Sequence, residues 1–363
     1  MTADRTASRQ RAGELVAPAL AALPQMVLPS GLLCHEIVEG DATPRGESVR
    51  YTLIALLGLL RAEHAGVPTP IAAAALRDAA DAALERPGPN PGDVALRLWA
   101  ESRADTGAGG GLVVRLEDAL EANGGLAGRE GLELAWVVTG LAAMPDPDSR
   151  ARRLLAAAVD QLIGANQAAS GLFRHFGDRG PRRRFPNFAT EIYSVLALSV
   201  VGRRGLDPRA LPAARRAADR LLTLQLADGG WPWMYDAELG TVVERYEVYS
   251  VHQHGMAPMT LHELSEACGD ERYAAAADRG VPWLFGANEL GADMAPLERG
   301  MTYRSIRRVR PLDRVWLYAN TAVARSPARG RAGRMLELNR SCRPYELGWL
   351  IEAWAGVNVA AHA

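Results

Sequence analysis

The sequence has no excess of charge of either sign. Its 363 residues include 41 Lys and Arg and 42 Asp and Glu, which gives a formal net charge of -1. A chain that binds nucleic acid or an acidic membrane over its whole surface carries a strong positive balance. We therefore expect neither partner. The 48% of hydrophobic residues is enough for a sizeable core.

Cysteines and long apolar runs are also scarce. Cys34, Cys268 and Cys342 form an odd, scattered set without a CxxC pair, which predicts neither a disulfide framework nor a cysteine-rich zinc site. We expect no metal, no cofactor and a reducing compartment. The polar amino terminus lacks a signal-peptide pattern, and no stretch of about 18 uncharged apolar residues follows, so a cytoplasmic location is expected.

Strand-like alternation is nearly absent, and helical periodicity dominates. Apolar residues at helical spacing predict helices over Ser48–Glu63, Leu132–Ala143, Leu154–Leu162, Glu191–Val201, Leu211–Leu226 and Met256–Ala267. Breaks are expected at Pro87–Gly92, Gly107–Gly111, Pro145–Pro147 and Asp228–Pro232. The Gly107–Gly111 stretch is expected to be a mobile loop.

A repeat is visible within this pattern. Gln167 and Gln225, 58 residues apart, are each followed by a glycine four residues on and an aromatic residue six residues on. We interpret the motif as a helix stop held by an aromatic plug. About six such units would fill the chain, and each has room for two helices. Because a helix pair cannot bury its apolar face alone, neighbours must stack, and six pairs can close into a ring.

The predicted fold is therefore an all-α, (α/α)6-type toroid of helical hairpins. We expect a single domain spanning residues 1–363, with residues 1–20 as a flexible extension. The centre of the toroid is the expected functional cavity, where side chains from distant parts of the chain would meet.

Two resemblances fit this architecture. The element Leu221–Trp233 (LLTLQLADGGWPW) resembles the repeat element of terpenoid cyclases and protein prenyltransferases, which are α/α toroids. The stretch Gly230–Phe285, with GWPWMYDAELG, YEVYSVHQHGMAPMTLHEL and DERYAAAADRGVPWLF in this order, resembles the carboxy-terminal α/α domain of glucuronyl C5-epimerases. That resemblance implies an enzyme acting on a uronate-bearing sugar.

The acid motifs of terpenoid enzymes are missing. Protonation of an olefin requires an Asp-x-Asp-Asp cluster, and ionisation of a diphosphate requires an Asp-rich metal site. The closest pair, Asp146 and Asp148, belongs to PDPDS, which is typical of a turn. Around Cys268 no convincing set of zinc ligands is present.

Polar and aromatic side chains are densest between Arg245 and His262. Tyr, His, Gln and Glu concentrate here, whereas the rest of the chain uses Ala and Leu. If this stretch is helical, Tyr246, Tyr249 and Gln253 share a face. A metal pair at His252 and His254 would require a break in the helix, and buried structural histidines are the alternative.

A second cluster is RRRFPNFATEIY, in which Asn187 can open a helix and Glu191 lies one turn further on. His175 holds the position in the first repeat that Trp233 holds in the second, so both are expected on one rim. A third cluster combines arginines with tyrosines, and arginine binds carboxylates with two parallel hydrogen bonds. Salt bridges between helices are the competing interpretation.

From these clusters we name candidates for two roles. The catalytic candidates are Tyr246, Tyr249, His252, His254, Glu191 and Glu247. The candidates for binding a substrate are Arg50, Tyr51, His175, Asn187, Tyr193, Trp233, Gln253, Tyr303, Arg304, Arg343 and Tyr345.

The expected function is that of a carbohydrate-active enzyme acting on a uronate-containing oligo- or polysaccharide, as a lyase, C5-epimerase or hydrolase. Proton abstraction beside a carboxylate requires a base and a positive group that offsets the enolate charge. Hydrolysis would instead require two facing carboxylates, Glu191 and Glu247. An isoprenoid-binding cyclase and a non-catalytic toroid that binds a glycan or a protein remain the alternatives. A small molecule or glycan is the expected partner.

Overall fold

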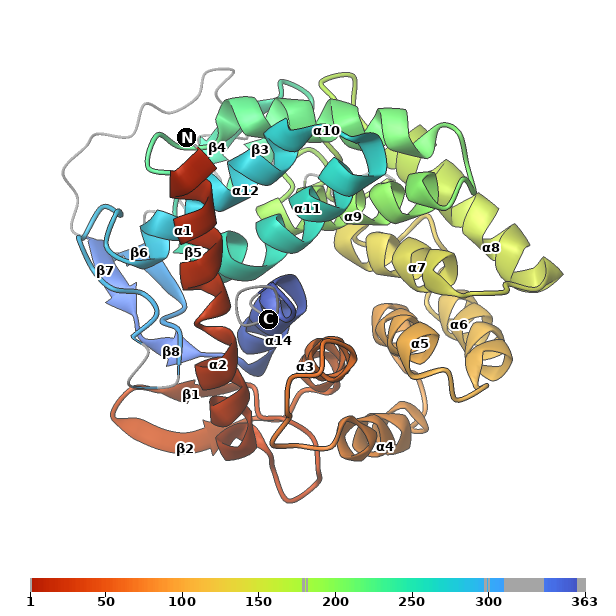
Figure 1. Ribbon diagram of the computed structural model, residues 1–363. Helices are drawn as coiled ribbons and strands as arrows, with labels where there is room; N and C mark the ends of the chain where they lie inside the picture. Colours follow the sequence, from red (N-terminus) through yellow and green to blue (C-terminus); the bar gives the residue numbers. More distant parts are fainter. Residues whose placement is uncertain are drawn as a thin grey trace.

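The computed structural model describes residues 2–177, 180, 182–296, 299, 301–309 and 336–357. Six helices form a closed inner ring, in which each packs against the next and the last packs against the first (Figure 1). They are α3 (Val49–His64), α5 (Pro91–Ala104), α7 (Gly131–Ala143), α9 (Phe188–Arg203), α11 (Ala257–Cys268) and α14 (Pro344–Trp354). The predicted all-α toroid is confirmed.

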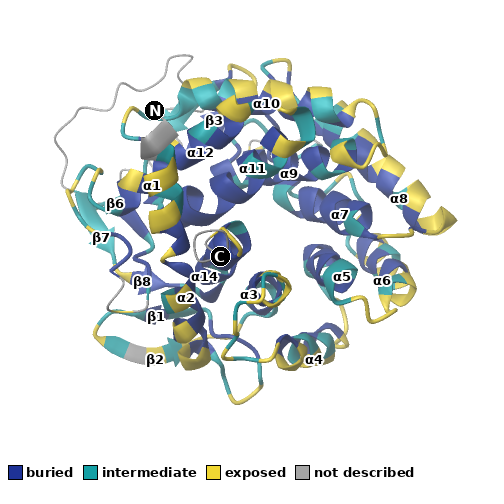
Figure 2. Cartoon of the chain, viewed as in Figure 1, coloured by how far each residue is buried: buried dark blue, intermediate teal, exposed yellow. Residues whose placement is uncertain are grey.

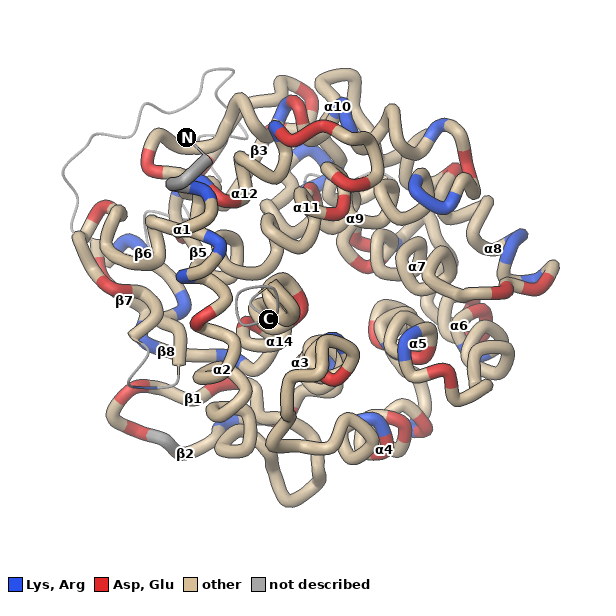
Figure 3. The backbone as a smooth tube through the Cα atoms, in the orientation of Figure 1, with Lys and Arg blue, Asp and Glu red and all other residues tan. Residues whose placement is uncertain are grey.

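An outer layer of helices surrounds this ring. Five of them each follow an inner helix and pack against it: α4 (Ala73–Leu84), α6 (Gly109–Ala122), α8 (Ser149–Asp160), α10 (Ala210–Leu224) and α12 (Glu271–Leu284). Figure 2 shows the inner helices as mostly buried, whereas the outer helices expose one side. Figure 3 shows charged residues along the outer helices and the small sheets, and also on the inner helices α3, α5 and α14.

The sequence explains which helix belongs to which layer. In α9 the apolar residues surround the axis, and nearly all of its residues are buried, as expected of a helix covered on all sides. In α10 the buried residues are alanines and Leu221 on one stripe, with arginines between them. Such an amphipathic helix packs against the inner ring and presents its charges to solvent.

The flexible extension expected at residues 1–20 is not observed. The segment forms α1 (Thr2–Gly13) and α2 (Val16–Ala22), which cover α12 and α14 and complete the outer layer. Arg5 and Arg9 each donate to the buried carboxylate of Asp278, and Leu15 and Leu20 are buried. Apolar burial and paired charges therefore hold this segment in place. The polar residues at the start of the chain do not reveal this packing in the sequence.

The inner helices all begin at the same end of the ring, because each outer helix returns the chain to that end. Three small antiparallel sheets lie there, in the strand orders β2-β1-β8, β3-β4 and β5-β6-β7. The strands are β1 (Glu36–Val38), β2 (Asp41–Arg45), β3 (Met234–Asp236), β4 (Thr241–Glu244), β5 (Val248–Tyr249), β6 (Ser305–Arg308), β7 (Leu336–Asn339) and β8 (Ser341–Cys342). The sequence did not reveal them, since strands of two to five residues are too short to display alternation.

The repeated glutamine motif is the helix stop that the sequence predicted. Gln167 donates to Gly171 O and to Ala213 O of α10. Gln225 repeats both bonds one unit later, to Gly229 O and to Ala276 O of α12. The aromatic plugs Phe173 and Trp231 are buried. Each motif therefore ends one outer helix and ties it to the next.

The two motifs also lead to equivalent positions on the rim of the ring. The carbonyl of His175 accepts from Gly131, the first residue of α7, and the carbonyl of Trp233 accepts from Phe188, the first residue of α9. The predicted equivalence of His175 and Trp233 is thus confirmed for the backbone. The mobile loop expected at Gly107–Gly111 is in part the first turn of α6, since Gly109 begins that helix.

Candidate active site

Two pairs of tyrosine and arginine meet where α3 and α14 begin. The rings of Tyr51 on α3 and Tyr345 on α14 have centroids 4.7 Å apart. Arg343 donates to the hydroxyl of Tyr51 at 2.9 Å, and the ring of His35 stacks on that of Tyr51 with centroids 5.2 Å apart. Arg343 Nε is buried and has no partner among the residues that the structure describes. Since Nη2 of Arg343 lies 3.6 Å from the Glu36 carboxylate, Nε is the one nitrogen of this group without a partner among the described residues.

The second pair is built around Arg304, which directly precedes β6. Its guanidinium donates to the hydroxyl of Tyr345 at 3.3 Å and to the Glu346 carboxylate at 2.5 Å. It also lies 4.9 Å above the ring of Tyr249, the last residue of β5. The pairing of Tyr249 with Ser305 in the β5–β6 ladder fixes this geometry. The small sheet thus brings Arg304 over a tyrosine that is distant in sequence.

Burial controls the protonation states in this cluster. Desolvation raises the pKa of the Tyr249 and Tyr345 hydroxyls above the usual value, although the charge of Arg304 partly opposes the rise. Carboxylate and phenol neighbours raise the pKa of Arg304 despite its own burial. At neutral pH these tyrosines are therefore neutral proton donors beside a charged arginine.

Aromatic side chains from three inner helices form the floor of the cluster. Tyr193 on α9 packs edge-on against Trp136 of α7, with centroids 5.3 Å apart, and lies 5.8 Å from Trp349 of α14. Tyr193 also interacts electrostatically with Tyr51 and Tyr345. Tyr193, Trp136 and Trp349 are each the sixth residue of their helix and are buried, so their rings pack in the second turn, below the residues at the amino ends.

Arg50 continues the cluster toward α5 and α7. Its guanidinium lies 5.0 Å from the ring of Trp136 and donates to Asp93 at 2.6 Å and to Glu133 at 3.1 Å. Asn90, which caps α5, donates to the same Glu133 carboxylate. Because two carboxylates neutralise Arg50, we assign it to orienting this side of the site rather than to binding an anion.

A further polar group lies where α7 and α9 begin. The ring of His175 is buried, with Nδ1 3.1 Å from Thr190 Oγ1 and Nε2 3.1 Å from Arg182. Burial and the charge of Arg182 lower the pKa of His175 to about 4. Asn187 caps α9 by accepting from Thr190 N, as its sequence position predicted. The carboxylate of Glu130 is 3.8 Å from His175 Nε2.

The two neighbouring histidines have different environments. The chain turns from β5 into a π-helical segment, η3 (His252–Met256), which leads into α11, the helix predicted at Met256–Ala267. Tyr249 ends a strand and Gln253 belongs to η3, so the shared helical face that a helix through Tyr246, Tyr249 and Gln253 would give does not form. His252 contacts Tyr249 and Phe188, and burial lowers its pKa to about 3. Neither ring nitrogen of His254 has a hydrogen-bond partner in the described structure. Only His252 adjoins the tyrosine cluster.

Several other candidates are engaged elsewhere. The two carboxylate oxygens of Glu191 share the single N–H of Phe173, and Glu247 accepts from Ser305 Oγ of β6. Both carboxylates therefore bind neighbouring segments of the chain. The hydroxyl of Tyr303 donates to Glu39. Tyr246 lies against Arg308 and Arg245. The amide nitrogen of Gln253 donates to Tyr249 O.

Sequence reasoning missed Asp93, Glu133, Trp136 and Trp349. A usable signal existed for Glu133 and Trp136, which lie three residues apart in the first turns of an otherwise apolar helix. Asp93 was hidden next to the Pro- and Gly-rich break. Their role depends on Arg50, which comes from a different hairpin, and one sequence does not reveal such a pairing.

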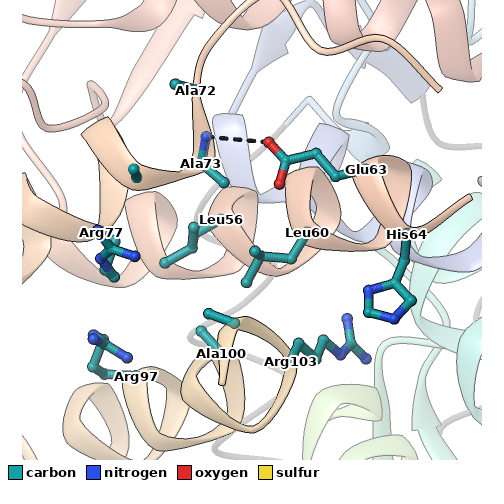
Figure 4. A pocket seen from close by; sticks show the side chains of 12 residues that line it. Leu56, Leu60, Glu63, His64, Ala72, Ala73, Arg77, Arg97, Ala100 and Arg103 are labelled. Atoms are coloured by element: carbon teal, nitrogen blue, oxygen red, sulfur yellow. Dashed lines mark hydrogen bonds between the residues drawn. The ribbon is translucent and has the colours of Figure 1, made fainter. Parts of the chain in front are cut away.

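Two cavities lie away from this cluster. One, of about 550 Å³, lies between α3, α4 and α5, with Leu56 and Leu60 facing Arg97 and Arg103 (Figure 4). The other, of about 540 Å³, includes Arg103, Glu263 and Glu352 at the carboxyl ends of inner helices. In these cavities the buried Arg97 is paired with Asp81, and the half-buried Arg103 is paired with Glu352. We place the candidate site at the amino ends because the tyrosine–arginine pairs and His252 gather there.

Within the described residues, no group of three or more His, Cys, Asp and Glu side chains could hold a metal ion. No described helix is long and apolar enough to cross a membrane.

The fold of this chain is similar to that of several solved structures. No protein-family model and no curated protein sequence match the chain. Among solved structures, it is similar to a cellobiose 2-epimerase from Bacillus thermoamylovorans (TM-score 0.65, 12% identity, 98% of this chain and 99% of the other). A sugar epimerase from a ruminal bacterium gives a TM-score of 0.63 at 11% identity, with 98% and 99% covered. A D-mannose isomerase gives 0.61 at 13% identity, with 94% and 95% covered. The toroid implied by the resemblance to glucuronyl C5-epimerases is thus supported, and that particular family is not.

Proposed function

We propose that this protein is a carbohydrate-active enzyme that moves a proton at a sugar carbon next to a carbonyl or carboxylate group. The observation that carries the proposal is the position of Arg304, 4.9 Å above the ring of Tyr249 and hydrogen-bonded to Tyr345. A phenol beside a fixed positive charge can give up a proton, because the guanidinium stabilises the phenolate that remains. Two of the similar structures named above are sugar epimerases and the third is a sugar isomerase, and this similarity supports an epimerase- or isomerase-type reaction.

The reaction also creates negative charge on the substrate. Removing the proton leaves an enolate, whose oxygen needs a donor within hydrogen-bond reach. Arg343 is suited to this, because its Nε is buried without a partner in the described part of the chain. A uronate carboxylate can accept from the same Nε, so we retain a uronate-containing glycan as the proposed substrate class.

The alternatives receive less support from the arrangement. Hydrolysis would require two free carboxylates, whereas Glu191 and Glu247 each accept hydrogen bonds from neighbouring segments. An isoprenoid site would be lined by aromatic residues without charges, but Arg50, Arg304 and Arg343 lie among the aromatic rings.

The test is solvent exchange. The protein is incubated in deuterated water with reducing mono- and disaccharides and with uronate-bearing oligosaccharides, and deuterium uptake by the sugar is measured by mass spectrometry. New absorbance from an unsaturated product and release of reducing ends are measured in parallel. We expect uptake with at least one sugar. Tyr249→Phe is expected to slow it by about 100-fold or more, the usual contribution of a general acid or base.

Tyr273→Phe is the matched control. The hydroxyl of Tyr273 on outer helix α12 donates to Asp219, away from the cluster, so this variant should exchange at the parent rate. No uptake by the parent with any sugar would refute the proposed function. So would a folded Tyr249→Phe variant that exchanges as fast as the parent.

A further inference from the structure

A buried glycine, Gly280, lies inside the outer helix α12. Glycine is a poor helix former, so a glycine inside a helix calls for a reason in the packing. A Cβ built on Gly280 would have three polar atoms as its nearest neighbours: Gly229 O at 3.3 Å, Gln253 Oε1 at 3.4 Å and Trp231 Nε1 at 3.8 Å. Hydrogen-bonding groups therefore surround the space beside this glycine.

Two of these three groups lack a partner. Trp231 Nε1 can only donate and Gln253 Oε1 can only accept, and both are buried without a hydrogen bond to the part of the chain that the structure describes. The other end of the Gln253 amide is engaged, since its Nε2 donates to Tyr249 O at 3.0 Å. Gly229 O accepts from Gln225 at 2.8 Å and has a second lone pair. One small molecule that both accepts and donates would satisfy all three atoms.

The repeated glutamine motif identifies the position in the first unit that corresponds to Gly280. In the first unit the motif glutamine bonds to Ala213 O, and Ala217 lies one turn further along α10. In the second unit the glutamine bonds to Ala276 O, and Gly280 lies one turn further along α12. Ala217 and Gly280 are therefore equivalent.

The aromatic plug changes together with this position. The first unit combines Phe173, whose ring has no N–H, with the methyl group of Ala217. The second unit combines Trp231, whose ring has an N–H, with Gly280, which has no side chain. An indole donor and the room for its partner thus occur in the same unit.

We propose that the space beside Gly280 holds one buried water molecule, which accepts from Trp231 Nε1 and donates to Gln253 Oε1 and to Gly229 O. Three hydrogen bonds are typical of a buried water. The water fixes the Gln253 amide, whose Nε2 in turn binds the carbonyl of Tyr249 at the end of β5. It thereby supports the strand that carries Tyr249, and the inference does not depend on the proposed function.

Gly280→Ala and Gly280→Ser test the site by urea unfolding. A methyl group at position 280 displaces the water and leaves the indole and the amide unpaired, whereas a serine hydroxyl can replace the water. Helix propensity alone favours alanine over serine. We therefore expect Gly280→Ser to have the higher unfolding midpoint, against the order of propensity.

The matched control is the same pair of substitutions at Gly111 in outer helix α6, where nothing lies within 4 Å of a new Cβ. There the alanine variant should have the higher midpoint, as propensity predicts. If Gly280→Ala is as stable as Gly280→Ser or more stable, the proposal is overturned.

A water-selective nuclear Overhauser measurement on protein with isotope-labelled tryptophan observes the site directly. The indole N–H of Trp231, assigned as the signal missing from Trp231→Phe, should show a cross-peak at the water frequency, and Gly280→Ala should abolish it. Trp283 is the internal control, because it is also buried and its indole donates to Glu289 at 3.2 Å, so it should show none. A Trp231 signal without this cross-peak, or one that keeps it in Gly280→Ala, would overturn the proposal.

Discussion

Replacing Gly348 with alanine tests the contact that closes the ring. A Cβ at position 348 would lie 2.7 Å from Ile54 O and 2.8 Å from the Cα of Ala55, and a Cβ at Gly58 would lie 2.5 Å from Gly348 O. All of these neighbours are backbone atoms of α3 or α14, so no side chain can move aside. Overpacking costs about 1–3 kcal/mol even where some relaxation is possible, and the better helix propensity of alanine returns up to about 1 kcal/mol. Because the clashing atoms belong to the backbone, we expect an overpacking cost in the upper part of that range. The free energy of unfolding should therefore fall by a net amount of about 1–2 kcal/mol.

Gly111→Ala is the matched control, since Gly111 lies in outer helix α6 with nothing within 4 Å of a new Cβ. The same chemical change there should stabilise the protein by about 0.5 kcal/mol through propensity alone. The assay is urea unfolding followed by circular dichroism, which compares the midpoints of the three proteins. If Gly348→Ala were as stable as the parent, α3 and α14 would not approach as closely as the structure has them.

Three further outcomes test the outer layer and the buried histidines. Gln225→Ala removes two hydrogen bonds to buried carbonyls and should lower the free energy of unfolding by about 1–3 kcal/mol in the same urea assay. An unchanged unfolding midpoint would contradict the role of the motif as a helix stop. Because the folded pKa of His252 is lowered to about 3 from 6.5, its contribution to stability is present above about pH 6.5 and is lost as the pH falls toward about 3. Relative to His252→Asn, the parent should therefore lose about 1.4 kcal/mol for each pH unit in that window, measured by unfolding at several pH values, and a constant difference would contradict this. Asp278→Asn weakens the pairing with Arg5 and Arg9 and should speed tryptic cleavage within α1, followed by mass spectrometry; cleavage at the parent rate would show that apolar packing alone holds the helix.

Local patterns carried much of the fold prediction. The helix predicted at Ser48–Glu63 is α3, for which Ser48 is the cap, and the one predicted at Leu211–Leu226 is α10. Helical periodicity is a property of neighbouring residues, so it is visible in a single sequence. The glutamine repeat was informative for the same reason, because each copy bonds to the glycine four residues on.

The site was predicted less completely. Arg304, Arg343, Tyr51, Tyr249 and Tyr345 were all named as candidates from local clusters of arginine and tyrosine, and the structure brings them together. Tyr303 belonged to the same sequence cluster, yet its hydroxyl donates to Glu39 instead. Tyr303 and Arg304 both precede β6, and the composition of a cluster does not say which of its side chains faces the centre.

The sequence by itself determined the helices, their amphipathic or wholly apolar character, and therefore the layer in which each would lie. Which residues share the centre was decided only by closure of the ring. Packing of whole elements brings α14 against α3 and pairs β5 with β6, so that Arg304 reaches Tyr249. It also brings Arg50 of α3 to Glu133 of α7. Contacts of that kind depend on how whole helices pack, and the spacing of residues along one sequence does not contain them.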